Sequence, residues 1–374
     1  MDALLRNSLV ALALLTQVVP AQFLGLGGSI EAESPEYRLR TATNSRSSFL
    51  SQLTSQGDDG YQFAGPFVSG ESSVNLFVRD LGTSRTFAYS VASSPSSVGG
   101  TLSQLNSNGA AGRAFVGFYA LGEDIDSIDN FNLFVEATGD PRTFEYRLEP
   151  STSSASAFLN RSNNLGSEGW QYLSPIFVGF SVQDLFVRTN VARQTWSYRL
   201  LGSPAAGTEL SQLNAQGRDG YSWRGGLFFG ESSRVLYERD NLRDVTVSYT
   251  TRAETSTRSS FSSQLNSQSR EGRYFVAPVF FGTPQNLYAQ LNESTSSGSN
   301  GIVIRLSRDG TLCFVLETSG AYQLQSSLTL NGDWQDVGEP MEGEADEKLT
   351  WTVGIGDGSD RRFYRVVLLV DEGS

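Results

Sequence analysis

Three glutamates recur at one position of a repeated pattern in this 374-residue chain, and paired carboxylates are the first chemistry to consider. Glu71, Glu123 and Glu231 each follow a short aromatic strand, in the sequences GES, GED and GES. Two carboxyl groups about 5 to 10 Å apart suffice for glycoside hydrolysis. Phe180 and Thr283 stand at this position in the other two copies. The pattern therefore favours solvated turn acids over a catalytic pair.

Three arginines recur in the same way at the end of a later strand. Arg79, Arg188 and Arg239 occupy this position, and an aspartate directly follows Arg79 and Arg239. A ring of guanidinium groups would suit an acidic sugar, because guanidinium binds carboxylate in a bidentate manner. Ion pairs at an exposed strand end are the favoured explanation of the same pattern. These arginines and the three glutamates are the candidate ligand-binding residues.

Three aromatic residues, Tyr61, Trp170 and Tyr221, share one repeat position at a turn between a helix and a strand. Such rings can stack on sugars, but a ring beside this turn is better placed to pack beneath the helix. A recurring acid precedes the same turn in four copies and is interpreted as a turn residue. These acids are Asp59, Glu168, Asp219 and Glu271.

The chain contains no histidine, which excludes Ser-His-Asp and Cys-His catalysis and histidine-based zinc sites. Its one cysteine, Cys313, stands in the apolar sequence LCFVL, which is typical of a buried inert thiol. The acidic segment 123–130 lacks the ligand spacing of a calcium loop. We predict no metal site and no cofactor. The sequence favours a protein without enzymatic activity and leaves that question open.

All of these residues belong to five tandem copies of one unit of about 52 residues. Each copy opens with a strand that contains a tyrosine: Tyr37, Tyr89, Tyr146, Tyr198 and Tyr249. A short amphipathic helix is predicted next, over 48–57, 101–109, 157–166, 209–217 and 260–269. Two strands follow, the first aromatic and the second of the type NLFVRD. The unit is therefore β-α-β-β, and the fold class is α+β.

Glycines near the helix ends suggest how the units turn. Gly57, Gly109, Gly166 and Gly217 are predicted to end the helices with a positive φ, and Ser269 predicts a weaker helix end in the fifth copy. The last strand of each copy runs directly into the tyrosine strand of the next copy. We therefore expect neighbouring copies to share one antiparallel ladder.

Single copies bury too little to stand alone, so they should pack on one another. A closed five-bladed αβ propeller leaves no exposed sheet edges and is favoured over an open repeat array. The predicted organisation is a signal peptide at 1–21, a lead-in at 22–35 and the five-repeat domain at 36–293. A Ser/Gly linker at 294–300 and a small all-β module at 301–374 follow.

The third copy, with LGSEGWQYLS at 165–174, resembles a small bacterial domain of unknown function. The resemblance rests on Gly166, Glu168, Gly169 and Trp170, and that family brings no established chemistry. Permuted by one strand, the order of elements also resembles the pentein propeller, whose enzymes use a catalytic cysteine and histidine. With no histidine in this chain and Cys313 outside the repeats, the resemblance implies the architecture without the activity.

The C-terminal part resembles a β-module that is appended to many secreted bacterial proteins. The match rests on the segment YQLQSSLTLNGDWQDV and the later RFYRVV. Its matching residues are Tyr322, Leu324, Ser326, Trp334, Phe363, Tyr364 and Arg365. The resemblance implies an appendage rather than a catalytic domain.

The net charge of −12 disfavours nucleic acid and anionic membranes as partners. Arg6, the apolar run 9–19 and the sequence VPA at 19–21 predict a cleaved signal peptide, and no later segment is apolar enough to span a membrane. We therefore expect a secreted, periplasmic or cell-surface bacterial protein.

Three functions remain open after these exclusions. The leading hypothesis is a non-catalytic binding module for a glycan or an extracellular protein, because regular repeats form extended surfaces. The alternatives are a carbohydrate-active hydrolase or lyase that uses Asp or Glu, and a structural protein of the envelope or surface layer.

Overall fold

The computed structural model describes residues 35–69, 72–81, 84–122, 128–190, 194–243 and 245–293 of the repeats. In the C-terminal part it describes residues 304–306, 311–315, 320–327, 335–343, 348–352 and 363–369. The chain divides into two compact units, one that ends at Glu293 and one that begins at Ser294. The first unit contains the repeats.

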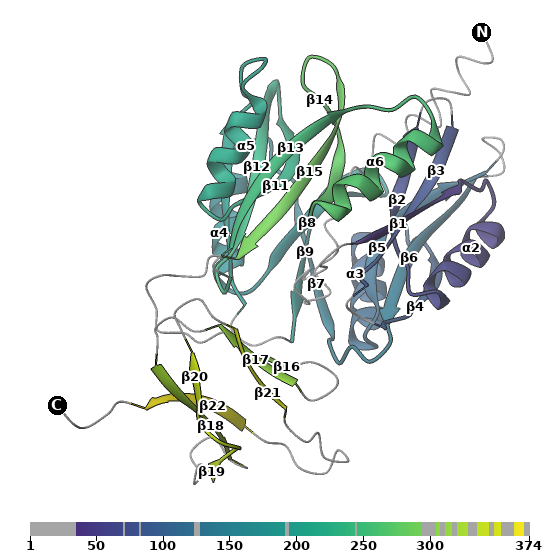
Figure 1. Ribbon diagram of the computed structural model, residues 1–374. Helices are drawn as coiled ribbons and strands as arrows, with labels where there is room; N and C mark the ends of the chain where they lie inside the picture. Colours follow the sequence, from purple (N-terminus) through teal and green to yellow (C-terminus); the bar gives the residue numbers. More distant parts are fainter. Residues whose placement is uncertain are drawn as a thin grey trace. The chain divides into compact units, whose positions relative to one another are not determined.

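The five copies have the predicted β-α-β-β order (Figure 1). The first comprises β1 (Glu36–Thr41), α2 (Arg46–Asp58), β2 (Gln62–Ser69) and β3 (Ser72–Arg79). The second comprises β4 (Phe87–Ser93), α3 (Val98–Ala110), β5 (Ala114–Leu121) and β6 (Asp129–Ala137). The third comprises β7 (Phe144–Pro150), α4 (Ala155–Ser167), β8 (Gln171–Val178) and β9 (Ser181–Thr189). The fourth comprises β10 (Trp196–Gly202), α5 (Glu209–Arg218), β11 (Ser222–Phe229) and β12 (Ser232–Asp240). The fifth comprises β13 (Val245–Ala253), α6 (Arg258–Arg270), β14 (Tyr274–Phe280) and β15 (Pro284–Glu293).

Four of the helices begin earlier than predicted because a hydroxyl caps them. The side chains of Ser45, Ser97, Ser154 and Thr257 each accept the backbone N–H three residues later. Helix α5 has no side-chain cap at Thr208 and is the shortest, with 10 residues.

Each copy forms its own three-stranded antiparallel sheet, with its last strand in the centre. The strand orders are β1-β3-β2, β4-β6-β5, β7-β9-β8, β10-β12-β11 and β13-β15-β14. The expectation of one ladder shared by neighbouring copies is therefore wrong. Strand β4 does not continue the sheet of β3, because its residues Phe87–Ser93 pair along their whole length with β6 of the same copy.

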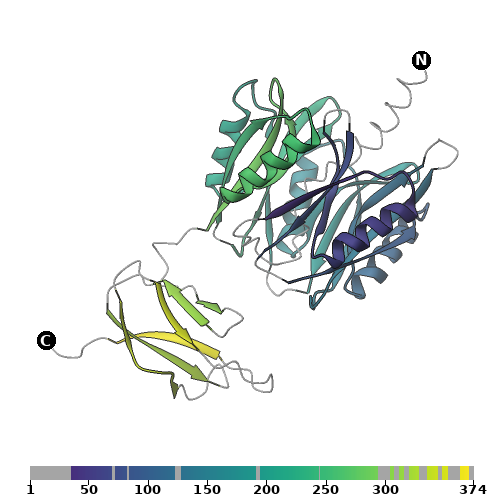
Figure 2. The ribbon, with the colours of Figure 1, turned by 45° about the vertical axis from the view of Figure 1, so that its right-hand side comes forward.

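The helices join neighbouring copies. Helix α2 packs on β4 of the second copy, and α3, α4 and α5 pack in the same way on β7, β10 and β13. Helix α6 of the fifth copy packs on β1 of the first, and the two views place this green helix beside the purple strand (Figures 1 and 2). Each contact buries an apolar core, such as the one in which Phe49 and Leu53 of α2 meet Phe131 and Leu133.

A buried tyrosine hydroxyl crosses each of these contacts. The second strand of every copy has a bulge, and the amide N–H just before it donates to the tyrosine of a neighbouring copy. Four of the bonds run to the next copy: Phe63 to Tyr89, Phe115 to Tyr146, Tyr172 to Tyr198 and Trp223 to Tyr249. The fifth joins Phe275 to Tyr37 of the first copy, at 2.8 Å. This hydroxyl explains why a tyrosine recurs in the first strand.

The substitution Tyr146→Phe tests this role. We expect a loss of about 1–3 kcal/mol in the free energy of unfolding, because the buried Phe115 N–H loses its acceptor. Urea denaturation checks the prediction. A loss below about 0.5 kcal/mol would mean that the hydroxyl contributes little net stability.

The predicted positive φ at the helix-end glycines is wrong. Gly109 lies inside α3, and the positive φ occurs three residues later, at Gly112. A Cβ on Gly109 would lie 2.1 Å from the Phe144 carbonyl oxygen of the next copy. The equivalent Gly57, Gly166 and Gly217 face a carbonyl oxygen of the next copy at 2.0, 2.3 and 1.9 Å. These glycines therefore permit close packing of the helix on the strand.

Ser269 takes this position in the fifth copy. Helix α6 nevertheless ends at the equivalent residue with the same type of backbone cap, so the expected weakening of this helix end is not seen. The Ser269 hydroxyl instead donates to the Pro35 carbonyl before β1.

We call each contact between two neighbouring copies a joint. In the joints in the middle of the chain, asparagine side chains add further hydrogen bonds. The Asn106 amide accepts from the Tyr146 N–H at 2.7 Å and donates to the Tyr146 carbonyl at 3.2 Å. Asn163 bonds Tyr198 and Asn214 bonds Tyr249 in the same two-point manner. The side chains thus pair part of the outer edges of β7, β10 and β13, which would otherwise expose their backbone groups.

The described residues of the second unit contain seven strands and no helix. One sheet has the order β16 (Ile304–Leu306), β17 (Thr311–Val315), β21 (Lys348–Thr352). In the other, β18 (Gly320–Ser327) pairs with β19 (Gln335–Asp336), β20 (Met341–Gly343) and β22 (Phe363–Leu369). Among the residues that the structure describes in both units, no helix is long and apolar enough to cross a membrane.

Candidate functional site

The predicted ligand-binding residues that the structure describes lie at two different ends of the copies. Arg79, Arg188 and Arg239 lie at or next to the last residue of the central strand. Glu231 is exposed in the hairpin that begins the same strand in the fourth copy, whereas Glu71 and Glu123 lie outside the described residues. Glu231 and Arg239 are eight residues apart, or about 26 Å along β12. Glu231 and Arg239 of the fourth copy therefore do not form one site.

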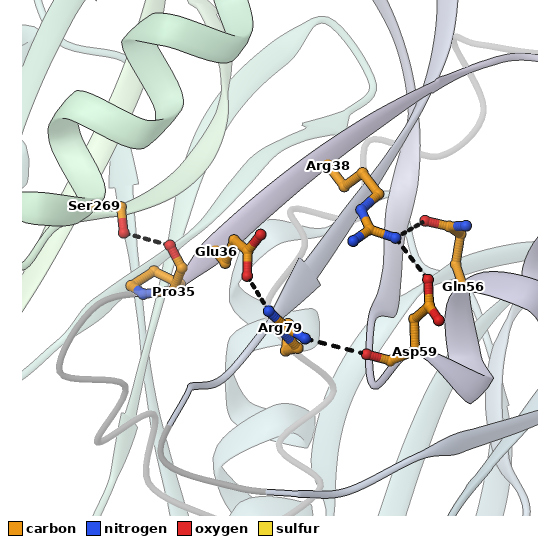
Figure 3. Close-up of polar contacts among 7 residues, drawn as sticks. All are labelled: Pro35, Glu36, Arg38, Gln56, Asp59, Arg79 and Ser269. Carbon is orange, nitrogen blue, oxygen red and sulfur yellow. Dashed lines mark hydrogen bonds and ion pairs between the residues drawn. The ribbon is translucent and has the colours of Figure 1, made fainter.

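At the arginine end of the first copy, Arg79 and Arg38 form ion pairs (Figure 3), and both guanidinium groups lie near a buried aromatic ring. Arg79 pairs with Glu36 and donates to the Asp59 carbonyl at 3.5 Å. Arg38 donates to the Asp59 carboxylate at 2.8 Å and to Gln56 at 3.2 Å. The nearby Tyr61 hydroxyl, together with Arg79, holds the pKa of the Glu36 carboxyl below its usual value against the effect of burial.

The ring at the centre of this cluster is Tyr61, which is fully buried. The guanidinium carbon of Arg38 lies 3.9 Å from the ring centroid, and that of Arg79 lies 4.8 Å from it. Arg188 covers Trp170 at 4.6 Å in the third copy. Packing of these rings, favoured from the sequence, is therefore confirmed.

The arginines form ion pairs, as favoured from the sequence, for Arg79 with Glu36 and for Arg188 with Glu145. A hollow of about 240 Å³ lies beside Arg188 and is lined by Glu168, Gln194 and Thr195. It is smaller than most ligand pockets. Since both guanidinium groups already have carboxylate partners, this end is better suited to stabilising the copies than to binding an acidic ligand.

The hairpin end has a different character, because large apolar side chains are exposed there. Phe177, Phe228 and Phe280 occupy one repeat position on the second strands and are 63, 80 and 72% exposed. In the third copy Phe180 at the hairpin tip is fully exposed, and Val182 pairs in register with Phe177. Patches of this kind mark interaction sites. We did not predict these phenylalanines, although their recurrence is visible when the copies are aligned.

The chain matches no protein-family model, no curated protein and no solved structure. Its own five copies are therefore the basis for comparison. Among the described residues, no group of three His, Cys, Asp or Glu side chains is placed to hold a metal ion.

Alignment of the copies shows polar substitutions between the third and fourth copies. Arg224 and Glu238 in the fourth copy stand where other copies have Ala, Val or Leu. In the third copy, Ser162 replaces a leucine, and Tyr172 replaces a phenylalanine or tryptophan. The leucines at the Ser162 position are Leu53, Leu105, Leu213 and Leu265, and all four are buried. At these positions, the joint between the third and fourth copies has polar side chains where most of the other copies have apolar ones.

Arg224 and Glu238 both belong to the fourth copy, and both bond to the third copy across this joint. The Arg224 Nη1 and Glu238 Oε1 atoms are 3.8 Å apart, with both side chains almost fully buried. Arg224 donates to the Tyr172 carbonyl at 2.9 Å, and Gln171 donates to Glu238 at 2.8 Å. Burial raises the pKa of the Glu238 carboxyl, against the opposing effects of Arg224, Gln171 and Tyr198.

A charge pair also replaces an amide pair in the third copy. In the second copy, Asn132 donates to Gln104 at 2.6 Å and so ties the helix to the central strand. Asp184 and Arg161 take these two positions in the third copy and form an ion pair. Burial raises the pKa of the Asp184 carboxyl. Burial also raises the pKa of the Tyr172 hydroxyl. The charge of Asp184 adds to this rise, whereas the charges of Arg224 and Arg161 oppose it.

The raised pKa of Glu238 predicts a pH-dependent stability difference. A carboxyl whose pKa is higher in the folded protein stabilises the fold fully below its unfolded pKa of about 4.3. This stabilisation is lost as the pH rises through the folded pKa. The free energy of unfolding of wild type should therefore fall relative to Arg224→Val/Glu238→Val between pH 4 and pH 8. Urea titrations at several pH values measure the difference, and a constant gap would contradict a raised pKa.

Proposed function

We propose that the five copies close into a five-bladed αβ propeller rather than an open array. What supports this is the set of contacts between the fifth and first copies: α6 against β1, the Ser269–Pro35 bond and the Phe275–Tyr37 bond. The core between them joins Phe261 and Phe275 to residues of β1 and β3. If the ring is closed, Tyr37→Phe should cost about as much stability as Tyr146→Phe.

We further propose that the protein is a non-catalytic binding protein of the cell exterior, and that its ligand is another protein. The observation that carries the proposal is the recurrence of exposed Phe177, Phe228 and Phe280 at the hairpin end. In a closed propeller, equivalent positions of the copies face the same end, so the three phenylalanine side chains would form one surface. Phenylalanine is enriched in protein interfaces, and buried aromatic anchors supply much of the binding energy.

The charge around these rings suggests the chemistry of the partner. Glu231 follows Phe228 by three residues. Between the second and third strands of the five copies, the segments 69–73, 121–130 and 229–233 contain Glu or Asp, the segments 178–182 and 281–284 are uncharged, and none of the five contains Lys or Arg. The whole chain is acidic, at −12. A partner surface with apolar and basic side chains would complement this end.

Site-specific photo-crosslinking tests the proposal. A benzophenone amino acid at position 228 should capture one defined protein from the envelope and extracellular fractions of the source cells. Leu242 is the matched control, because it is 54% exposed and follows the opposite end of β12 in the same copy. The captured protein, once purified, should bind wild type at least ~100-fold more tightly than Phe177→Ser/Phe228→Ser/Phe280→Ser. Equal capture from both positions, or equal affinities, would refute the proposal.

A glycan is the second candidate ligand, because exposed aromatic rings can also stack on sugars. A glycan array with wild type and the triple serine variant separates the two. Selective binding that the variant loses would make the ligand a glycan, and release of cleaved sugar would indicate a hydrolase or lyase. Concentration-dependent self-assembly in ultracentrifugation would instead support a structural role.

A further inference from the structure

The five joints between copies provide an internal comparison of stability. All share the tyrosine hydroxyl bond, and each buries an apolar core. The joint between the third and fourth copies also buries Arg224 and Glu238. The second and third copies have apolar residues at these two positions. Differences between the joints can therefore be traced to these substitutions.

Several buried polar atoms at this joint have no hydrogen-bond partner. Among the described residues, nine buried side-chain nitrogen or oxygen atoms have no hydrogen-bond partner. Five of these atoms belong to the substituted residues of the third and fourth copies. These five are Arg161 Nε, Ser162 Oγ, Tyr172 OH, Arg224 Nε and Glu238 Oε2. A buried polar atom without a partner loses its hydration with no compensating bond. This joint therefore gains less from closure than its four counterparts.

The ion pair does not compensate for this loss. Two buried charges repay their desolvation only when their geometry is good and their remaining polar atoms are bonded. The Arg224–Glu238 separation of 3.8 Å exceeds a hydrogen bond, and each partner retains an unpaired atom. Opening of the joint exposes these atoms to water, which supplies the hydrogen-bond partners that they lack in the closed form.

We infer that the joint between the third and fourth copies is where the five-copy domain opens first. Opening there separates β8 from β11 and breaks the bond from the Tyr172 amide to the Tyr198 hydroxyl, which is 2.6 Å long in the closed form. The other four joints stay closed during this event. The inference does not depend on what the protein binds.

Amide hydrogen exchange of the full-length protein, followed by NMR, tests this inference. The five equivalent amides of Phe63, Phe115, Tyr172, Trp223 and Phe275 all donate to a tyrosine hydroxyl. We expect the protection factor of Tyr172 to be at least ten-fold lower than those of the other four. Equal protection at all five, or lowest protection at Phe275 between the fifth and first copies, would overturn the inference.

The variant Arg224→Val/Glu238→Val provides the second arm of the experiment. It gives the joint the side chains that the second copy has at these positions, Val116 and Val135. Protection of Tyr172 should rise at least ten-fold, while that of Phe115 changes little. If Tyr172 protection is unchanged or falls while Phe115 remains protected, the polar pair is not what opens the joint.

Discussion

The substitution Gly109→Ala is expected to destabilise the repeat domain by about 3 kcal/mol or more. The added Cβ would lie 2.1 Å from the Phe144 carbonyl oxygen and 3.0 Å from the Tyr146 ring, and neither group has room to move without displacing β7. Since a domain of this size shifts by about 2–4 °C per kcal/mol, the melting temperature should fall by about 10 °C. Calorimetry measures both quantities.

Gly99→Ala is the matched control in the same helix. A Cβ at Gly99 would meet nothing within 4 Å, and alanine favours the helix over glycine by up to about 1 kcal/mol. This variant should therefore be unchanged or more stable. Similar melting temperatures for the two variants would show that α3 does not approach β7 as closely as the structure requires.

Arg224→Val is expected to destabilise the protein by about 3–5 kcal/mol at pH 7, whereas Arg224→Val/Glu238→Val should stabilise it by about 1–4 kcal/mol. The single change leaves a buried carboxylate without its guanidinium neighbour. The double change removes both charges and fills the joint with the valines that the second copy uses at these positions. Chemical denaturation of the three proteins gives the two differences.

The comparison isolates the charge pair, because both variants carry the same valine at position 224. If the double variant is less stable than the single one, the pair is not the cause of the weak joint. If the single variant is as stable as wild type, Glu238 already has a compensating partner other than Arg224.

The repeated unit was predictable from the sequence because its signals are local. The recurring tyrosines, the short helices and the two following strands all appear at the predicted places. The spacing of these residues sets the order of the helix and strands within each copy, and the three strands of a copy pair with one another. Contacts between copies were harder to predict, because a turn from β3 into β4 fits both a shared ladder and separate sheets.

The helix-end glycines illustrate the same limit. Gly109 was assigned a positive φ from its position in the helix, but its role is to let the Phe144 carbonyl of the next copy approach. No property of the helix sequence reveals a carbonyl that belongs to another unit. The exposed phenylalanines were missed for a similar reason, since strand alternation does not say which face the neighbouring helix leaves uncovered.

The polar joint between the third and fourth copies is defined by differences between equivalent positions of the copies, not by a motif within one copy. Arg224 and Glu238 look like ordinary surface charges in the sequence, since Arg224 stands beside two glycines and Glu238 opens the charged run ERD. Their burial follows from the bulge that precedes Gly225 and from the packing of the fourth copy on the third. Alignment of a chain with itself thus locates a joint that motif searches do not detect.

Closure of the ring is the claim on which the common hairpin surface depends, and a disulfide between the first and fifth copies tests it most directly. Cysteines at positions 35 and 269, in a Cys313→Ser background, replace two residues that are hydrogen-bonded across this contact. A closed ring predicts that oxidation links them within one chain and stabilises the domain by about 5 kcal/mol, because the bond closes a loop of more than 200 residues. Thiols that stay free, or bonds that form only between two chains, would contradict closure.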